Sequence, residues 1–338
     1  MHKLKQNVIN LGNMGIKHLN KFLRENCKNS IKCISMSELS GKKIAIDISI
    51  YLYKYVGDDS LIENMYLMIS IFRYYNITPI FIFDGKPPTE KKELLKRRRE
   101  NKLDAEKEYN RLRDCLEEIA DDSEKQEIIA NMDSLKKQFV YVNKKHIELV
   151  KELLTSFGVN YCDAPGEADE LCAMLVLKKK VWCCMSEDMD LFAYGCSRVL
   201  RYFSLINRTA ILYDMKCILY ELSITMKEFR QICVLSGTDY NISYDGNDNM
   251  NLQKTTKIFK KYKKTKEDID FYEWFRKNYP DCEDNYDILL SIYKLFDLSD
   301  NHSHLKSYED INICNSVVIK EALRTILEND GFIFAASG

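Results

Sequence analysis

The chain has 338 residues, 46% of them apolar and 30% charged, and its formal net charge is −1. This balance is typical of a soluble globular protein with one large or two ordinary domains, and it excludes a chain that is drawn as a whole to nucleic acid. Twelve cysteines without a CxxC pair, and no apolar run of membrane-spanning length, predict a reduced intracellular protein of the nucleus or cytoplasm that is not secreted and has no membrane partner.

The first quarter of the sequence predicts two strands that each end in an acid. The elements expected there, in chain order, are a polar extension (1–13), an amphipathic helix (16–26), a strand (42–49), a long helix (about 50–75) and a second strand (78–85). The apolar run of the first strand ends at Asp47, and the second strand ends at Asp84. Because a carboxylate at the end of a central strand is costly unless it is paired or binds a metal, chance placement of both acids is the weaker interpretation.

Residues 89–157 contain neither glycine nor proline, which predicts long helices. A break near residues 121–123 divides the stretch into two helices that meet at an acidic tip. Between residues 86 and 113 there are eleven Lys or Arg against six Asp or Glu, including the run KRRR at 96–99. A solvated helix is the ordinary interpretation of such charge. The asymmetry favours phosphate binding at the basic start, beside Asp84, and repulsion from the tip.

The stretch 163–190 carries two pairs of acids around an apolar helix and a buried strand. Pro165-Gly166 starts the helix, so that Glu167 and Asp169 fall in its first turn. Asp188 and Asp190 follow the predicted strand 181–185. Acids favour helix N-termini, so capping alone is an alternative for the first pair. Since ligands in open α/β sheets gather at the carboxyl ends of strands, convergence of these acids would require a cation such as Mg²⁺.

Past residue 190 the pattern predicts an edge hairpin and then helices. The elements are strands 199–203 and 209–214, a helix (215–236), a lysine-rich helix (251–266) and further helices (270–338). A seventh acid, Asp239, follows the helix stop at Gly237. The lysine-rich helix has seven lysines and no acid; it is either a solvated face or a phosphate-binding one. The five histidines are scattered and are predicted to be surface or core residues rather than ligands.

Six motifs, in this order, resemble the flap endonuclease and xeroderma-pigmentosum-G-type structure-specific 5′ nucleases, and flap endonucleases most of all. They are MGIKHL (14–19), IAIDIS (44–49), FIFDGKPP (81–88), DAPGEADELCA (163–173), SEDMDLFAYG (186–195) and LSGTDY (235–240). The resemblance implies an α/β fold with a mostly parallel twisted sheet flanked by helices, a PIN-like nuclease core over 14–240. It also implies a helical arch over 86–145 and a helical duplex-binding and C-terminal region over 241–338.

The resemblance also assigns roles to single residues. One Mg²⁺ would be held by Asp47, Asp84, Glu167 and Asp169, and a second by Asp169, Asp188, Asp190 and Asp239, with Mn²⁺ as a substitute. Lys91 or Lys92, with Arg97, would engage the scissile phosphate, and the terminal base would stack on Tyr53. DNA would further contact Arg98 and the lysines of 251–266, namely Lys254, Lys257, Lys260, Lys261, Lys263 and Lys264.

The function implied is metal-dependent hydrolysis of DNA at 5′ flaps and 5′ ends, in replication, repair or recombination, by a monomer acting on branched or nicked DNA. Alternatives are a non-catalytic scaffold that binds DNA junctions and a related nuclease for other junctions or RNA. The sequence departs from the family in four ways: thirteen residues precede the family's Met-Gly start, Asp169 stands where flap endonucleases usually have Glu, 241–252 lacks the Gly-Ile-Gly-like turn, and no clamp-binding tail is evident.

Overall fold

The computed structural model describes residues 15–116, 122–240, 250–265, 267–280, 286–299 and 302–334. Within these ranges one seven-stranded sheet forms the centre, in the order β1-β7-β6-β5-β2-β3-β4. The strands are β1 (Ile31–Ser35), β2 (Lys43–Asp47), β3 (Thr78–Phe83), β4 (Asn160–Asp163), β5 (Cys183–Met185), β6 (Arg198–Ser204) and β7 (Thr209–Asp214).

The sheet is parallel except at one side. Strands β4, β3, β2, β5 and β6 run parallel to their neighbours, whereas β7 pairs antiparallel with both β6 and β1. The predicted hairpin of β6 and β7 is present, but its place at the edge was wrong. The short strand β1, which pairs Ile31 with Tyr213 and Ser35 with Thr209, covers β7 and takes the edge.

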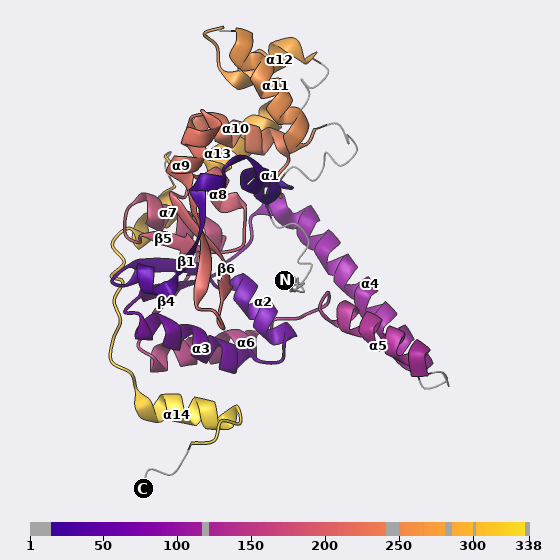
Figure 1. The fold of residues 1–338 in the computed structure, drawn as a ribbon, viewed down its shortest axis with the longest axis vertical. Helices are drawn as coiled ribbons and strands as arrows, with labels where there is room; N and C mark the ends of the chain where they lie inside the picture. The colour runs from indigo at the N-terminus through magenta and orange to yellow at the C-terminus, as the bar shows by residue number, and fades with distance from the viewer. Residues whose placement is uncertain are drawn as a thin grey trace.

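Helices cover both faces of the sheet, as Figure 1 shows. Packed into one core are α1 (Leu19–Asn26), α7 (Ala168–Leu177), α8 (Asp190–Tyr194), α9 (Met215–Leu222), α10 (Met226–Ser236), α11 (Leu252–Thr265), α12 (Phe271–Asn278) and α13 (Tyr286–Phe296). The other core contains α2 (Ser49–Gly57), α3 (Leu61–Tyr74), α6 (Lys144–Ser156) and α14 (Lys320–Asn329).

Alternation along the central strands produces these two cores. Ala45 of β2 faces the first core, while Ile44 and Ile46 face the second. Both side chains of such a strand are buried, which is why its sequence reads as a continuous apolar run. The predicted fold class, a mostly parallel sheet between helices, is confirmed.

Two helices form an arm that leaves the body of the protein, α4 (Lys92–Leu116) and α5 (Asp122–Lys136), which lie against each other (Figure 1). In α4 only Leu94 and Ala105 are buried, so the charged residues of this helix face solvent, as its composition predicts. The absence of glycine and proline over 89–157 therefore predicted the helices correctly. The acidic tip lies partly outside the described residues, since 117–121 are not described.

Two predicted helices are each divided. The stretch 50–75 becomes α2 and α3, separated at Asp58–Ser60, where Asp59 has a φ of 51°. The stretch 215–236 becomes α9 and α10, separated at Ser223, with a φ of 55°. Left-handed backbone at such a residue ends a helix, and neither site has the glycine that signals this conformation most clearly.

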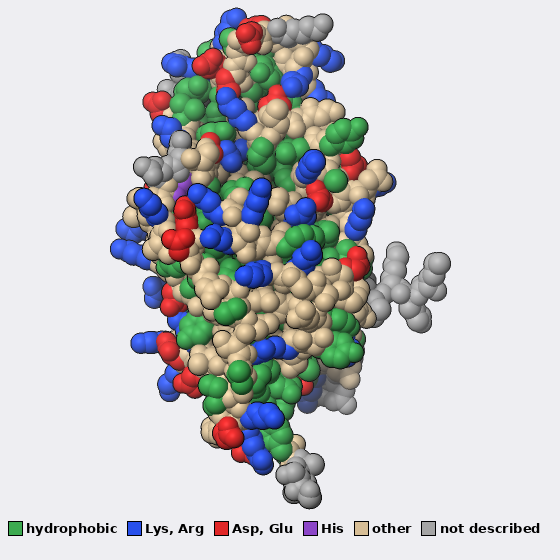
Figure 2. All heavy atoms as spheres, turned by 90° about the vertical axis from the view of Figure 1, so that its left-hand side faces the viewer, with side chains coloured by type: hydrophobic (Ala, Val, Ile, Leu, Met, Phe, Trp, Pro, Cys, Tyr) green, Lys and Arg blue, Asp and Glu red, His purple; other side chains and the backbone are tan. Residues whose placement is uncertain are grey.

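The surface of the body is mixed in charge. On the face drawn in Figure 2, Lys and Arg side chains are spread among acidic and apolar ones and form no continuous patch of one sign. No helix among the described residues is both long and apolar enough to cross a membrane. The segment 241–249, where the Gly-Ile-Gly-like turn is missing from the sequence, lies outside the described residues.

Candidate functional site

Acidic residues gather where the central strands end. Asp47 ends β2, Asp84 directly follows β3, and Asp188 and Asp190 follow β5. The carboxyl ends of these strands lie side by side, because β2 pairs in parallel with both β3 and β5. The other three predicted acids come from helix ends near this edge: Glu167 and Asp169 at the start of α7, and Asp239 after α10.

The centre of the cluster is formed by Asp169, Asp188 and Asp190, each of which offers one oxygen atom within 4.8 Å of the others. Asp190 is 0% exposed. Neither of its carboxylate oxygens has a hydrogen-bond partner, and Asp169 Oδ2 also has none. Buried carboxylate oxygens without donors are costly, and oxygen ligands of this kind suit Mg²⁺. The residues present therefore fit a hard divalent cation.

The electrostatics of the cluster agree with this fit. Burial, reinforced by the neighbouring Asp188, raises the pKa of Asp190 well above that of an ordinary carboxyl. Burial also raises the pKa of Asp169, with the charge of Glu167 as the next cause. For Asp47, burial and then the charge of Asp84 raise the pKa to about 7. A bound cation would remove this penalty, because it stabilises the charged form of each acid.

Asp47 and Asp84 are held by hydrogen bonds that sequence reasoning missed. The Ser186 hydroxyl donates to Asp47 Oδ2 (2.8 Å), and the same oxygen accepts from the Asp188 amide (3.0 Å). Asp84 accepts from the hydroxyl of Ser49 and, at 2.9 Å, from the amide of Ala168 at the start of α7. Both serines lie in the quoted motifs, as the residues after IAIDI and before EDMD, but a serine near an acid is too common to be a signal.

Lys91 is the only cation of the predicted pair that enters the cluster. Its ammonium lies 2.8 Å from Glu167 Oε1 and 3.8 Å from Asp190 Oδ2, and its side chain is 7% exposed. Burial lowers the pKa of Lys91, but the charges of Asp190 and Asp169 outweigh burial and raise it overall. Lys92, one residue later at the start of α4, is exposed. The choice between them, open in the sequence, is thus geometrically clear.

Tyr240 supports Lys91 from the other side. Its hydroxyl donates to Glu167 Oε2 at 2.6 Å, and the Lys91 ammonium lies 4.6 Å from the centre of its ring. This tyrosine follows Asp239 in the LSGTDY motif, and the sequence gave no sign of its contact. Glu167 is consequently held in place by a cation and a hydroxyl at once.

The arginines and Tyr53 lie near the base of the arm. Arg98 pairs with Asp239 at 2.8 Å, while Arg97 is exposed on α4. Tyr53 is half-buried on α2, and the ammonium of Lys102 lies 4.5 Å from the centre of its ring. A base that stacks on this face of Tyr53 would have to share or displace that lysine.

Helix α11 presents the predicted lysines far along the chain from the acids. The exposed ones are Lys254, Lys257, Lys260, Lys261, Lys263 and Lys264. The opposite face of the helix is fixed by the buried Leu252, Ile258 and Phe259. Lys263 already pairs with Glu228 of α10 at 2.7 Å, so the remaining five carry the charge that is open to a ligand.

Gly15 lies directly against the acid cluster. A methyl group at its Cα would come within 2.5 Å of Asp188 Oδ1 and 2.9 Å of the Asp190 amide, and its φ is +72°. Both the contact and the backbone conformation require glycine. The start of the family motif MGIKHL therefore packs at the site.

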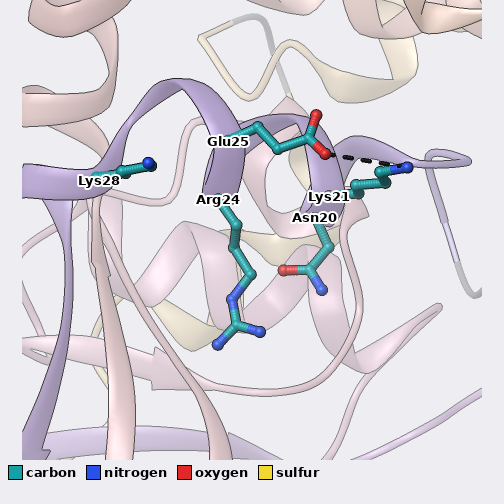
Figure 3. A pocket seen from close by; sticks show the side chains of 5 residues that line it. All are labelled: Asn20, Lys21, Arg24, Glu25 and Lys28. Carbon is teal, nitrogen blue, oxygen red and sulfur yellow. Dashed lines mark ion pairs between the residues drawn. The ribbon is translucent and has the colours of Figure 1, made fainter.

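A surface pocket of about 420 Å³ lies elsewhere, along α1. Figure 3 shows its lining, Asn20, Lys21, Arg24, Glu25 and Lys28, in which the Lys21 and Glu25 side chains point toward each other. The ion pair between them spans 3.9 Å and is highly exposed, so it contributes little stability. None of the seven acids lines this pocket, and its shallow charged wall identifies no ligand.

The chain matches two family models, the XPG N-terminal domain over residues 14–105 and the XPG I-region over 158–239. It is 30% identical over 299 residues to flap endonuclease 1 of Glossina morsitans morsitans, which covers 83% of this chain and 74% of that protein. Flap endonuclease 1 of Encephalitozoon cuniculi is 34% identical (67% of this chain, 68% of that one), and that of Zea mays 32% (69% and 64%).

Solved structures share the fold. The catalytic core of Rad2 in complex with DNA substrate has a TM-score of 0.61 at 22% identity, covering 92% of this chain and 93% of that one. Flap endonuclease-1 from Methanococcus jannaschii has a TM-score of 0.53 at 24% identity, with coverage of 88% and 94%. The chain therefore belongs to the flap endonuclease family of XPG-type nucleases.

Proposed function

We propose that this protein is a metal-dependent, structure-specific 5′ nuclease that hydrolyses phosphodiester bonds of DNA at 5′ flaps and 5′ ends. The observation that carries the proposal is the convergence of Asp169, Asp188 and Asp190, buried and without donors, in a chain of this family. Such a centre binds cations and repels anions, so a bound cation is needed before a phosphate can approach.

Two Mg²⁺ ions are the proposed cofactors, with Mn²⁺ able to replace them. Asp47, Asp84, Glu167 and Asp169 would hold one ion, and Asp188, Asp190 and Asp239 would hold the other together with Asp169. Such a pair of ions provides a nucleophilic hydroxide at neutral pH and stabilises the attacking and leaving oxygens. The chain's part is to keep the ligands fixed, which the hydrogen bonds of Ser49 and Ser186 support.

The base of the arm supplies the cations of the chain itself. Lys91 and Arg97 are the proposed contacts of the scissile phosphate. Lys91 precedes α4 and lies in the cluster, whereas Arg97 is one and a half turns further along the helix, exposed. Cations placed where charge develops stabilise the transition state more than the ground state.

Replacing Arg97 with alanine should slow single-turnover cleavage of a 5′-flap substrate by roughly 10- to 100-fold and change the DNA dissociation constant less than about threefold. The reason is that its contact is aimed at the reacting phosphate rather than at the duplex. Arg113→Ala, further out on the same helix and 58% exposed, is the control and should cleave normally. An equal loss of affinity and rate in Arg97→Ala would show that Arg97 only binds DNA.

Helix α11 is the proposed contact of the duplex. Neutralising Lys254, Lys257, Lys260 and Lys261 with glutamine should flatten the dependence of log Kd on log salt by roughly three, since each phosphate neutralised contributes about 0.9. The four side chains are exposed, so the fold should be unaffected. A set of four exposed lysines on another surface, Lys137, Lys144, Lys145 and Lys306, makes the control. An unchanged slope in the first variant would place the duplex elsewhere.

The proposed substrate class is tested with labelled DNA of defined structure. Double-flap DNA, nicked duplex, blunt duplex, a three-way junction and an RNA flap are compared under single-turnover conditions with Mg²⁺. The proposal expects the double flap to be cut fastest, at the base of the flap. Preference for another junction or for RNA would keep the nuclease but change its specificity, and tight binding of all substrates without cleavage would favour a scaffold.

A further inference from the structure

A second group of metal-ligating side chains lies beside the acid cluster. It consists of Glu170, in the first turn of α7, and His302 and His304, in the segment that starts the 3-10 helix Ser303–Tyr308. One donor atom from each residue lies within 4.8 Å of the others. The histidines were predicted to be scattered surface or core residues. Two of them instead meet an acid more than 130 residues away in sequence.

The hydrogen bonds of His302 fix which nitrogen faces the acid. Its Nε2 lies 3.0 Å from the backbone carbonyl of Asp297. Because a carbonyl only accepts, Nε2 carries the proton, and in the neutral ring Nδ1 presents a lone pair. That Nδ1 lies 3.2 Å from Glu170 Oε1, so two lone pairs face each other unless a cation lies between them. A ring N–H bonded to a backbone carbonyl is the arrangement that orients histidine ligands of metals.

Asp297 is itself held firmly, which fixes the direction of its carbonyl. Its carboxylate pairs with Arg230 of α10 at 3.0 Å and accepts from the hydroxyl of Ser299 at 2.8 Å. Arg230 also donates to the carbonyl of Ala193 at 2.9 Å. The ring of His302 is therefore oriented by a network that extends into the core.

The separations in the cluster match those around a small transition-metal ion. His304 Nε2 lies 3.0 Å from Glu170 Oε1 and 3.1 Å from Oε2. Ligands of a tetrahedral zinc ion at about 2.0–2.1 Å lie roughly 3.3 Å from one another. The side chain of His304 is 46% exposed, whereas those of Glu170 and His302 are 14% and 18% exposed. The group is thus half-buried, with a path to solvent along His304.

We propose that Glu170, His302 and His304 form a zinc site, separate from the acid centre, with a fourth position open to water. Imidazole nitrogen favours zinc over Mg²⁺, which selects an all-oxygen site such as the neighbouring one. A zinc ion here would join the segment after α13 to the first turn of α7. That turn also carries Asp169, so zinc would fix the backbone from which a central acid projects.

The test is calorimetric titration of the full-length, reduced protein with Zn²⁺ in excess Mg²⁺, which keeps zinc from the acid centre. We expect one zinc ion per chain and a rise in the unfolding temperature. His304→Ala and Glu170→Gln should each weaken zinc binding by more than about tenfold and remove the rise. His146→Gln is the control, because glutamine keeps the cap hydrogen bond that His146 makes to Asn143.

Two results would overturn the proposal: no zinc binding by the wild-type protein above neutral pH, or binding that both variants retain, which would assign the zinc to cysteines. Circular dichroism of the metal-free variants establishes that they fold. His304 is exposed enough that its replacement should leave the fold intact, so a loss of zinc binding there reports the site itself.

Discussion

Asp190→Asn is expected to lower the rate of flap cleavage roughly a thousandfold while DNA binding in Mg²⁺ stays close to that of the wild type. Asp190 is fully buried, its oxygens have no donor, and it is a proposed ligand of one ion. A weakened ion costs several kcal/mol of transition-state stabilisation, and each 1.4 kcal/mol is about tenfold in rate. The substitution keeps the shape of the side chain, so packing should survive.

The same variant should be more stable than the wild type in EDTA. Burial raises the pKa of Asp190, so the folded, metal-free protein binds the proton more tightly than the unfolded chain. That contribution to stability is present at acid pH and is lost as pH rises from about 4 past neutrality. At about pH 8 Asp190→Asn should therefore unfold a few degrees higher than the wild type, and near pH 5 the difference should shrink.

Asp104→Asn is the matched control, because Asp104 is 74% exposed on α4 and pairs only with Lys107. It should cleave and unfold as the wild type does. If Asp190→Asn lowered the unfolding temperature in EDTA at every pH, the acid would have a structural role. If it cleaved normally, the centre of catalysis would lie elsewhere.

Lys91→Met is expected to have the largest effect on stability in EDTA, a loss of about 3–5 kcal/mol. Lys91 is buried against Glu167 and Asp190, and removing one partner of a buried ion pair leaves the other charge uncompensated. Saturating Mg²⁺ should recover most of the loss, because bound cations replace the missing charge. Cleavage should remain at least tenfold slower even then, since the proposed contact with the phosphate is gone.

Lys92→Met separates this effect from a general change in the arm. Lys92 is the next residue and is exposed, so its replacement should change stability by less than about 0.5 kcal/mol. Denaturant unfolding in EDTA and in Mg²⁺ gives the four values needed. Equal losses for both variants, or a loss in Lys91→Met that Mg²⁺ does not reduce, would contradict the placement of Lys91 as the cation of the metal-free cluster.

The sequence predicted the acid cluster because a simple rule places it. Asp47 and Asp84 end apolar runs that can only be central strands, and parallel strands end at one edge of a sheet. The sheet itself was predicted less completely. Strand β1, IKCIS, and strand β4, NYCD, lie at the two edges, where one side of each strand is free and the apolar signal is weak. Their placement depends on pairing across the sheet, which no local pattern contains.

Contacts between distant segments were beyond the sequence for the same reason. Nothing local distinguishes Lys91 from Lys92, because both lie in one charged run, and burial is decided by where η3 (Thr89–Lys91) joins α4. His302 and His304 have no ligand-like spacing with Glu170. Their meeting depends on the return of the chain after α13 to the start of α7, a tertiary event. Lys102 on the ring of Tyr53 is another such contact, between the arm and α2.

The most direct test of the account is incision of a 5′-labelled double-flap DNA by the wild-type protein with Mg²⁺ and with EDTA. We predict a single incision at the base of the flap that requires Mg²⁺ and is restored by adding the ion after chelation. Equal incision in EDTA would contradict the claim that the acid cluster acts through metal ions, and no incision with tight binding retained would contradict the claim that the protein is a nuclease.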